Sequence, residues 1–215
     1  APIKIDKYGG DALPVINGMG IDRGMNYSGA VHLRNQEYWE IRNLEVTNDD
    51  DFDVDIDLSR PQGDNSWSSQ AETRNGILII ADGDLLNDGD DGIFNHIYIE
   101  NCYVHDVDGP NDWNDTFTGG IIYNVVGTKI RPNTSFRDIR IAYNTIRKVD
   151  LLGITGFVQM AKSGYQDDVD TYNLWMEDIY IGHNYIEDVA QGGIDLCDAR
   201  NAVVEYNVVD GFLKR

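Results

Sequence analysis

Short runs in which apolar and polar residues alternate recur along this chain, and their period of two predicts β-strands. The clearest pair lies near the C-terminus, where the pattern I-x-x-N-x-I of residues 181–186 returns as V-x-x-N-x-V at 204–209, 23 residues later. A repeat of this length is typical of solenoids, in which stacked copies of one unit share a core. Because the unit consists of strands and turns without helical periodicity, the pattern predicts a β-helix.

The same pattern runs back through the chain. Its leading apolar residue occurs five times, at spacings of 58, 42, 40 and 23 residues: Ile41, Ile99, Ile141, Ile181 and Val204. Only the last interval, of 23 residues, has the length of one coil without insertions, so the other coils carry inserted loops. We place these inserts at two corners of the coil, at roughly residues 47–75, 105–119, 83–95, 127–137 and 160–177. Inserted loops of solenoids collect on particular faces, which are often binding faces.

A second strand, which begins with glycine, alternates with the first. It occurs at residues 29–31, 76–78, 120–122, 153–155 and 193–195. The glycine is expected at a tight corner that needs either a positive φ angle or a close approach of two backbones. Two strands in each coil give about five coils, which we expect to form a single domain over residues 1–215, itself part of a longer β-helix.

The alignment of the coils makes a specific prediction about register. We expect four segments to stack in register as one parallel sheet: residues 97–104, 139–146, 179–186 and 203–209. Asn144, Asn184 and Asn207 then occupy one position, which Leu44 and Cys102 occupy in the earlier coils. Stacked Asn side chains can satisfy one another's amide groups and tolerate a left-handed backbone, so their expected role is structural.

Charge and cysteine content limit the possible partners. The chain has 37 acidic and 17 basic residues and a formal net charge of −20, so nucleic acids and anionic membranes would be repelled. It contains no apolar run long enough to span a membrane. Cys102 and Cys197 show no metal-binding or redox spacing, and each lies in a predicted strand. We therefore expect both cysteines to be small buried hydrophobic residues.

The chain resembles the right-handed parallel β-helix superfamily, which has the pectate-lyase-like fold. Four runs carry the resemblance: IYIENCYVHDVDG (97–109), IRIAYNTIRKVD (139–150), IYIGHNYIEDV (179–189) and VVEYNVV (203–209). The resemblance implies an all-β, right-handed parallel β-helix that acts on carbohydrate and is secreted or on the surface of a bacterial cell. The chain is more similar to β-helix glycoside hydrolases, such as the lacto-N-biosidase type, than to pectate lyases, whose calcium triad and catalytic Arg match no residues here.

The alignment places Asp106, Lys148 and Asp188 on one ladder, one coil apart. Neighbouring coils lie about 4.8 Å apart, so the two carboxylates would lie roughly 10 Å apart with an amine between them. This distance is at the wide end of the range that inverting glycosidases use. Lys148 would keep both carboxylates ionised, which suits a base and disfavours an acid. A charge-balanced structural ladder is the alternative interpretation.

Asp195 is another candidate acid or base. It points outward from the last glycine-led strand, beside Thr155 of the preceding coil and near the inserts. The alternative is an ordinary solvated position on a strand. Three tryptophans lie in inserts and could stack on sugar rings or, equally, hold the inserts against the wall of the helix: Trp67, Trp113 and Trp175.

Two inserts are rich in acidic residues, at 49–58 and 82–92. Carboxylate oxygens two residues apart are ligands that Ca²⁺ prefers. The second insert therefore predicts a calcium site with four candidate ligands: Asp82, Asp84, Asp88 and Asp90. Neither insert follows the order of an EF-hand loop, and a solvated acidic loop is the alternative.

Three functions remain open. The favoured one is hydrolysis of glycosidic bonds by carboxylate acid and base residues, with four candidates: Asp106, Lys148, Asp188 and Asp195. A polysaccharide lyase, which needs Ca²⁺ or an Arg/Lys pair beside a base, and a non-catalytic β-helix that binds glycan or supports a partner are the alternatives, and fold does not decide among them. We also expect a further protein segment or chain to cover an end of the β-helix, because an uncovered end exposes backbone groups and apolar core.

Overall fold

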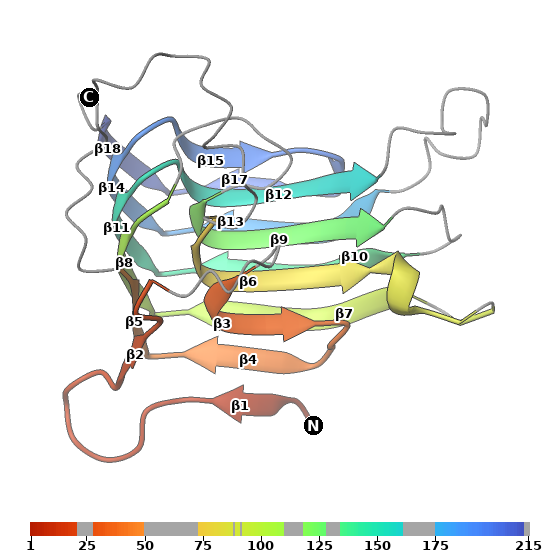
Figure 1. Cartoon of the computed structure of the whole chain (residues 1–215), viewed down its shortest axis with the longest axis horizontal. Helices are drawn as coiled ribbons and strands as arrows, with labels where there is room; N and C mark the ends of the chain where they lie inside the picture. The colour runs from red at the N-terminus through yellow and green to blue at the C-terminus, as the bar shows by residue number, and fades with distance from the viewer. Residues whose placement is uncertain are drawn as a thin grey trace.

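The computed structural model describes residues 1–20, 28–49, 73–87, 89–90, 92–109, 118–127, 134–160 and 175–212. Over these residues the chain winds through three sheets of parallel strands, which we name A, B and C (Figure 1). Each turn of the chain passes through sheet A, then B, then C, and returns to A one rung higher. The N-terminal strand lies at the bottom of the stack in Figure 1 and the C-terminal strands lie at its top.

The strands of each sheet follow one another at regular intervals along the chain. Sheet A contains β1 (Ile3–Ile5), β4 (Trp39–Arg42), β7 (Ile93–Glu100), β10 (Ser135–Ala142) and β13 (Met176–Gly182), with β16 (Ala199–Arg200) and β17 (Val203–Glu205) beside β13. Sheet B contains β2 (Val15–Asn17), β5 (Glu45–Asn48), β8 (Tyr103–Val107), β11 (Thr145–Val149), β14 (Tyr185–Val189) and β18 (Val208–Phe212). Sheet C contains β3 (Gly29–Arg34), β6 (Asn75–Asp82), β9 (Gly119–Gly127), β12 (Leu152–Met160) and β15 (Gly192–Leu196). A short 3-10 helix, η3 (Gly83–Leu85), follows β6.

This arrangement confirms the predicted right-handed parallel β-helix. All paired strands among the described residues are parallel, and the five strands of sheet C complete five coils before β16, β17 and β18 begin a sixth. In the described part of the chain no helix is long and apolar enough to cross a membrane. Most residues of the predicted inserts lie outside the described residues.

The core consists of rows of apolar residues, because equivalent positions pair from coil to coil. In sheet A the row of Ile41, Ile99, Ile141 and Ile181 is paired in series and fully buried. The predicted register of the leading apolar residues is therefore confirmed. Each fully buried isoleucine contributes about 1.5–3 kcal/mol of hydrophobic stabilisation, and its branched side chain packs well on a pleated surface.

Each predicted strand phrase bends in the middle and contributes to two sheets, A and B. The bend falls at Asn101, Tyr143, His183 and Tyr206, whose φ angles of 55°, 59°, 58° and 54° are left-handed. The prediction of one continuous sheet was therefore wrong, although the parallel direction and the register are confirmed. A left-handed residue turns the chain out of the strand direction, and here no glycine signals it in the sequence.

Inside this corner, asparagines form a ladder that runs along the helix axis. Asn144 Nδ2 donates to Asn184 Oδ1 at 3.0 Å, and Asn184 Nδ2 donates to Asn207 Oδ1 at 2.9 Å. Each amide nitrogen also donates to a strand carbonyl, and the two acceptor oxygens also accept from backbone N–H groups. The predicted structural role is confirmed. The left-handed backbone expected at these asparagines belongs instead to the residue before each one.

The glycines that begin the strands of sheet C are required by close packing. A Cβ atom on Gly153 would lie 2.5 Å from Gly193 O, and one on Gly120 would lie 2.7 Å from Ile146 Cγ2. The predicted alignment of the first such strand was wrong by one residue. Val31 pairs with Ile77, so Ala30 and not Gly29 occupies the glycine position in that coil.

The two cysteines have different environments. Cys102 is buried below the asparagine ladder, as predicted, and burial raises the pKa of its thiol to about 11. Cys197 is exposed and lies just after β15. The prediction that Cys197 is buried was wrong, because the chain has already left the strand at this residue.

The last rung leaves inward-facing side chains uncovered. Val204 and Val209 pair with Ile181 and Ile186 of the rung below, so they face the core, yet they are 46% and 43% exposed. The expected segment or chain that covers an end of the β-helix is not tested by this exposure. That covering segment stays a prediction.

Replacing the central asparagine of the ladder tests its contribution to stability. Asn184→Ala is expected to lower the free energy of unfolding by about 3 kcal/mol or more, because several buried partners would each lose about 1–3 kcal/mol. The free energy is measured by urea denaturation. Gln36→Ala is the control, since Gln36 is exposed and bonds only to adjacent carbonyls; its expected effect is below about 0.5 kcal/mol. Equal losses in the two variants would contradict a stabilising ladder.

Candidate functional site

The predicted ladder of Asp106, Lys148 and Asp188 exists on the outer face of sheet B. Their neighbours on both sides pair from coil to coil, so the three residues occupy successive rungs. All three have left-handed φ angles, of 47°, 52° and 53°, and their side chains are partly exposed. A left-handed non-glycine residue costs roughly 1–2 kcal/mol. The residues at the corner between sheets A and B also have left-handed φ angles. We therefore attribute the left-handed backbone of the ladder, and its cost, to the way in which each coil turns.

Asp106 is surrounded by hydrogen-bond donors. Lys148 Nζ lies 3.3 Å from Asp106 Oδ1, and His105 Nδ1 lies 2.5 Å from Asp106 Oδ2. The other ring nitrogen of His105 lies 3.3 Å from Glu45 Oε1. Burial, the largest single effect, would raise the pKa of Asp106, but the contacts with His105 and Lys148 together lower it. Asp106 is therefore suited to remain ionised and is a poor proton donor.

Asp188 has a different cationic neighbour. Arg147 Nε lies 3.7 Å from Asp188 Oδ2 and 2.6 Å from Glu187 Oε1. Lys148 therefore contacts Asp106 on the rung below it, and the cation that contacts Asp188 is Arg147. On the rung above Asp188 stands Gly211, on which a Cβ atom would lie 3.7 Å from Asp188 Oδ1. Gly211 therefore places no side chain against this carboxylate.

Asp195 lies on the outer face of sheet C, one strand after Asp188 in the same coil. It pairs with Thr155, as predicted. Its carboxylate folds back over Gly192, where a Cβ atom would lie 2.7 Å from Asp195 Oδ2 and 2.8 Å from Leu152 Cδ2. Burial raises the pKa of Asp195. Among the described residues no hydrogen bond or ion pair involves this carboxylate.

The surroundings of Asp195 are apolar. A second hydrophobic cluster, separate from the core, has Leu78 and Ile122 on the outward row that continues into Thr155 and Asp195. Its other members are Ile80, Val126, Leu151 and Leu152. A carboxylate beside such a surface favours its protonated form. Asp188 and Asp195 therefore differ in their surroundings, because Asp188 lies beside Arg147 and Asp195 lies beside apolar residues.

The predicted tryptophans do not gather around these carboxylates in the described residues. Trp67 and Trp113 lie outside them. Trp175 is 39% exposed and immediately precedes β13, and its carbonyl accepts a hydrogen bond from Ser135 Oγ at 2.8 Å. All of β13 and the corner after it separate Trp175 from Asp188 on sheet B.

The predicted calcium ligands have partners within the protein. Asp82 accepts a hydrogen bond from Asp84 N at 2.9 Å and forms an ion pair with Arg34. Asp90 Oδ2 accepts from Asn87 N at 2.8 Å. A search of the described residues finds no group of three His, Cys, Asp or Glu that could hold a metal ion. Asp88 and most of the other acidic insert lie outside those residues, so the calcium site stays a prediction.

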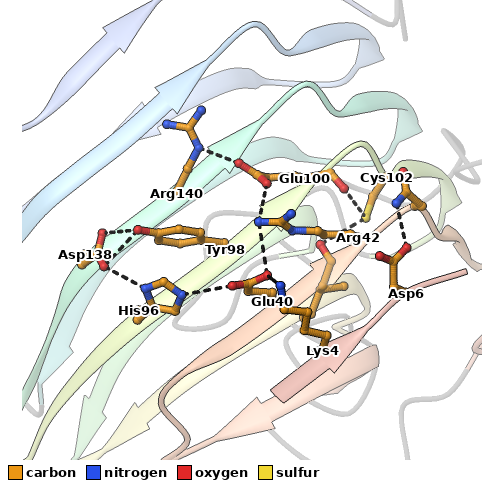
Figure 2. A network of polar contacts seen from close by, with 12 residues as sticks. Lys4, Asp6, Glu40, Arg42, His96, Tyr98, Glu100, Cys102, Asp138 and Arg140 are labelled. Carbon is orange, nitrogen blue, oxygen red and sulfur yellow. Dashed lines mark hydrogen bonds and ion pairs between the residues drawn. The ribbon is translucent and has the colours of Figure 1, made fainter. Parts of the chain in front are cut away.

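Sequence reasoning missed a network of charged residues on the outer face of sheet A (Figure 2). Glu40, which is nearly buried, pairs with Lys4 at 2.9 Å and with Arg42 at 3.2 Å. Arg42 also pairs with Glu100 at 3.0 Å, and Glu100 receives Arg140 Nε at 2.5 Å. The hydrogen bond from Lys4 is the largest cause that lowers the pKa of Glu40. Each carboxylate is therefore met by cations from neighbouring coils.

A histidine extends this network. His96 lies between Asp138, 3.1 Å from its Nδ1, and Glu40, 3.4 Å from its Nε2. Tyr98 donates to Asp138 at 3.0 Å (Figure 2). Opposite charges at equivalent positions of the repeated phrase were the signal in the sequence that could have revealed this network. The charged groups of this network are paired with one another, so the network connects neighbouring coils. In this it differs from the carboxylate of Asp195, which has no partner among the described residues.

No protein-family model matches the chain. Lacto-N-biosidase from Bifidobacterium longum subsp. longum is 26% identical over 262 aligned residues, which cover 100% of this chain and 16% of that protein. Two crystal structures of GH136 lacto-N-biosidase from Eubacterium ramulus, the native protein and a selenomethionine derivative, match with TM-scores of 0.77 and 0.73 and identities of 23% and 24%. Each match covers 99% of this chain and 35% of that chain. The chain thus spans about a third of the solved protein, and the likeness shows that the two share the β-helix fold.

The raised pKa of Asp195 predicts a pH-dependent effect on stability. Between the ordinary carboxyl pKa of 3.8 and the raised value, the folded state holds the proton more tightly than the unfolded chain. Stability is therefore lost as the pH rises through this window. Asp195→Asn should remove that loss, so the Tm of the variant relative to the original protein should be higher at pH 7 than at pH 3.5 (two pH values chosen on either side of about 4). A relative Tm that is lower at pH 7 would contradict the assignment.

The predicted calcium site can be tested by removing metal from the whole protein. If Ca²⁺ binds the folded state, EDTA should lower the Tm by several degrees and excess Ca²⁺ should restore it, because a ligand of the native state stabilises it. Differential scanning calorimetry measures both changes. Identical melting curves in EDTA and in Ca²⁺ would exclude a stabilising calcium ion.

Proposed function

We propose that this β-helix forms the catalytic part of a glycoside hydrolase, with Asp195 as the general acid and Asp188 as the general base. The observation that carries the proposal is the contrast between the two carboxylates of one coil. Among the described residues Asp195 lies against apolar side chains without a hydrogen bond or ion pair, whereas Asp188 lies beside Arg147. Glycosidases need one carboxyl group that holds a proton and one that does not.

The proposed reaction follows from these two states. Protonated Asp195 donates its proton to the glycosidic oxygen as the bond between that oxygen and the anomeric carbon breaks. Asp188, which lies beside Arg147, takes a proton from the water that attacks the anomeric carbon. One water is consumed, both carboxyl groups have exchanged their protonation states, and proton exchange with solvent restores them.

Asp106 and Lys148 have a supporting role in this proposal. Lys148 Nζ lies 3.3 Å from Asp106 Oδ1, and the donors around Asp106 keep it ionised. Both residues lie on the same ladder as Asp188, with Lys148 one rung below it and Asp106 two rungs below it. They therefore fix the side chains of sheet B beneath the base, and neither needs to exchange a proton.

The similar proteins suggest the substrate. The relatives that match over nearly the whole of this chain are named lacto-N-biosidases, so we propose a lacto-N-bioside as the substrate and lacto-N-biose as the disaccharide released from it. The location outside or on the surface of a bacterial cell, inferred from the resemblance, suits such a substrate and stays a prediction. The chain covers 16% and 35% of these relatives, so the activity of a whole lacto-N-biosidase is carried over to it only as a proposal.

A polysaccharide lyase remains the second candidate, because a lysine beside a carboxylate, as in Lys148 and Asp106, could stabilise an enolate. Product analysis separates the two. Hydrolysis gives a new reducing end, whereas elimination gives an unsaturated sugar with new ultraviolet absorbance. A protein that binds glycan without forming either product would be a binding module.

Substitution of the two carboxylates tests the assignment. In the full-length protein, Asp195→Asn and Asp188→Asn should each lower kcat on a chromogenic lacto-N-bioside by about 10²–10⁴-fold, with little change in Tm at neutral pH for Asp188→Asn. Asp178→Asn is the matched control, because Asp178 also has a left-handed φ, of 58° against 53°, but lies in sheet A. Activity that survives in both site variants, or falls equally in the control, would contradict the proposed site.

A further inference from the structure

Gly192, the first residue of β15, carries no side chain at a place where one would meet the carboxylate of Asp195. A Cβ atom on Gly192 would lie 2.7 Å from Asp195 Oδ2 and 2.8 Å from Leu152 Cδ2. Both distances are shorter than ordinary van der Waals contacts, so a methyl group there would have to displace one or both side chains. The carboxylate therefore lies over the backbone of Gly192 and beside Leu152.

The backbone at Gly192 does not itself require a glycine. Its φ angle lies outside the left-handed region. The three atoms nearest to the added Cβ all belong to the side chains of Asp195 and Leu152. At Gly153, by contrast, the nearest atom is the backbone oxygen of Gly193, at 2.5 Å. A larger residue at position 192 would therefore disturb the side chain of Asp195 before it disturbed the pairing of the coils.

One other glycine of sheet C makes room in the same way. Gly119 occupies the position equivalent to Gly192, two rungs below it, because both pair with Leu152. A Cβ atom on Gly119 would clash with Ile122 Cδ1, and Ile122 follows Gly119 by three residues, as Asp195 follows Gly192. Both glycines therefore accommodate a side chain of their own strand that folds back over them.

Asp195 differs from Ile122 because it remains accessible. Gly192 and Asp195 are both partly exposed, whereas Ile122 and Leu152 are buried. Among the described residues no hydrogen bond or ion pair holds the Asp195 carboxylate. Packing against Gly192 and Leu152 is therefore what the described chain offers to orient it.

Few titratable groups lie near this carboxylate. The strand below, β12, presents the uncharged Leu152 and Thr155 to β15. Cys197 and Asp198 follow Asp195 in the chain. Asp198 Oδ2 accepts a hydrogen bond from the Val158 backbone N–H at 3.0 Å, so it faces β12 and not Asp195.

We propose that Gly192 is a positioning residue for the general acid, because the space that it leaves lets the Asp195 carboxylate lie against Leu152. The inference rests on the proposed function. An acid has to keep its proton until the glycosidic oxygen is within reach, and contact with an apolar side chain favours the protonated form. Burial accordingly raises the pKa of Asp195. An alanine at position 192 would turn the carboxylate away from Leu152 and toward solvent.

Gly192→Ala in the full-length protein tests the inference with one measurement of stability and one of turnover. In the original protein, stability should fall as the pH rises above the ordinary value of 3.8, because the folded state holds the Asp195 proton more tightly. A carboxylate turned toward solvent should lose this effect. The Tm of Gly192→Ala relative to the original protein should therefore be higher at pH 7 than at pH 3.5 (chosen on either side of about 4). On a chromogenic lacto-N-bioside, kcat should fall about 10²-fold, as for a misplaced catalytic group, with KM nearly unchanged.

Gly182→Ala is the matched control. Gly182 lies in the same coil but on sheet A, and a Cβ atom there would clash with the ring and hydroxyl of Tyr180. This variant also displaces a polar side chain that lies over a glycine, so kcat and the pH dependence of Tm should be unchanged. If Gly192→Ala does not fold, Leu152→Val is compared with Leu152→Val/Gly192→Ala instead. Valine lacks the Cδ2 atom that the alanine would meet, so the Asp195 carboxylate is then the group displaced.

Each possible outcome decides the inference. Equal relative Tm values of Gly192→Ala at the two pH values would overturn the positioning role, because the carboxylate would not have been displaced. An equal loss of kcat in Gly182→Ala would overturn it as well. If Gly192→Ala keeps full kcat while Asp195→Asn loses it, the positioning role is wrong and the proposed function stands. Full turnover in Asp195→Asn, or none in the original protein, would overturn the proposed acid and its positioning residue together.

Discussion

The in-register pairing of each coil with the coil below is the constraint on which the rest of the structure depends. Parallel backbone hydrogen bonds place residues of equivalent sequence position directly above one another, about 4.8 Å apart. A residue type that recurs at one position of every coil therefore has to be stable when its copies stack directly on one another. Isoleucine satisfies this inside sheet A, where Ile41, Ile99, Ile141 and Ile181 share one buried line. Polar residues satisfy it only when each can bond to the next.

Two polar rows meet this constraint and a third does not. Inside the corner, Asn144, Asn184 and Asn207 bond amide to amide along the axis. On sheet A, acidic and basic residues alternate, so that Glu40 and Glu100 are each met by a cation from a neighbouring coil (Figure 2). On sheet C the row through Thr155 and Asp195 offers no such pairing. Two of the rows bond from coil to coil, and the third contains Asp195, to which we assign the proposed acid role.

In sheets A and B the sequence was sufficient to predict the register, because alternation with a period of two fixes which side chains face the core. In sheet C the alignment failed by one residue at Gly29. Matching Ile141 with Ile181 by their phrases also placed Lys148 one rung below Asp188 on the outer ladder. The bend within each phrase could not be found in this way, because the left-handed position holds Tyr143 or His183 and no glycine. The difference between the carboxylates was likewise hidden, since it depends on which neighbour each side chain reaches. Arg147, and not Lys148, lies beside Asp188, and nothing charged approaches Asp195 among the described residues.

The central claim is that the outer faces of sheets B and C, where Asp188 and Asp195 follow each other in one coil, bind and cleave a glycosidic bond. A crystal structure of the full-length Asp195→Asn protein with a bound lacto-N-bioside tests this most directly. The claim predicts electron density for the sugar against sheet C, with its glycosidic oxygen in hydrogen-bond contact with the side chain at position 195. Sugar bound over the charged network of sheet A, or at a distance from both position 195 and Asp188, would contradict it.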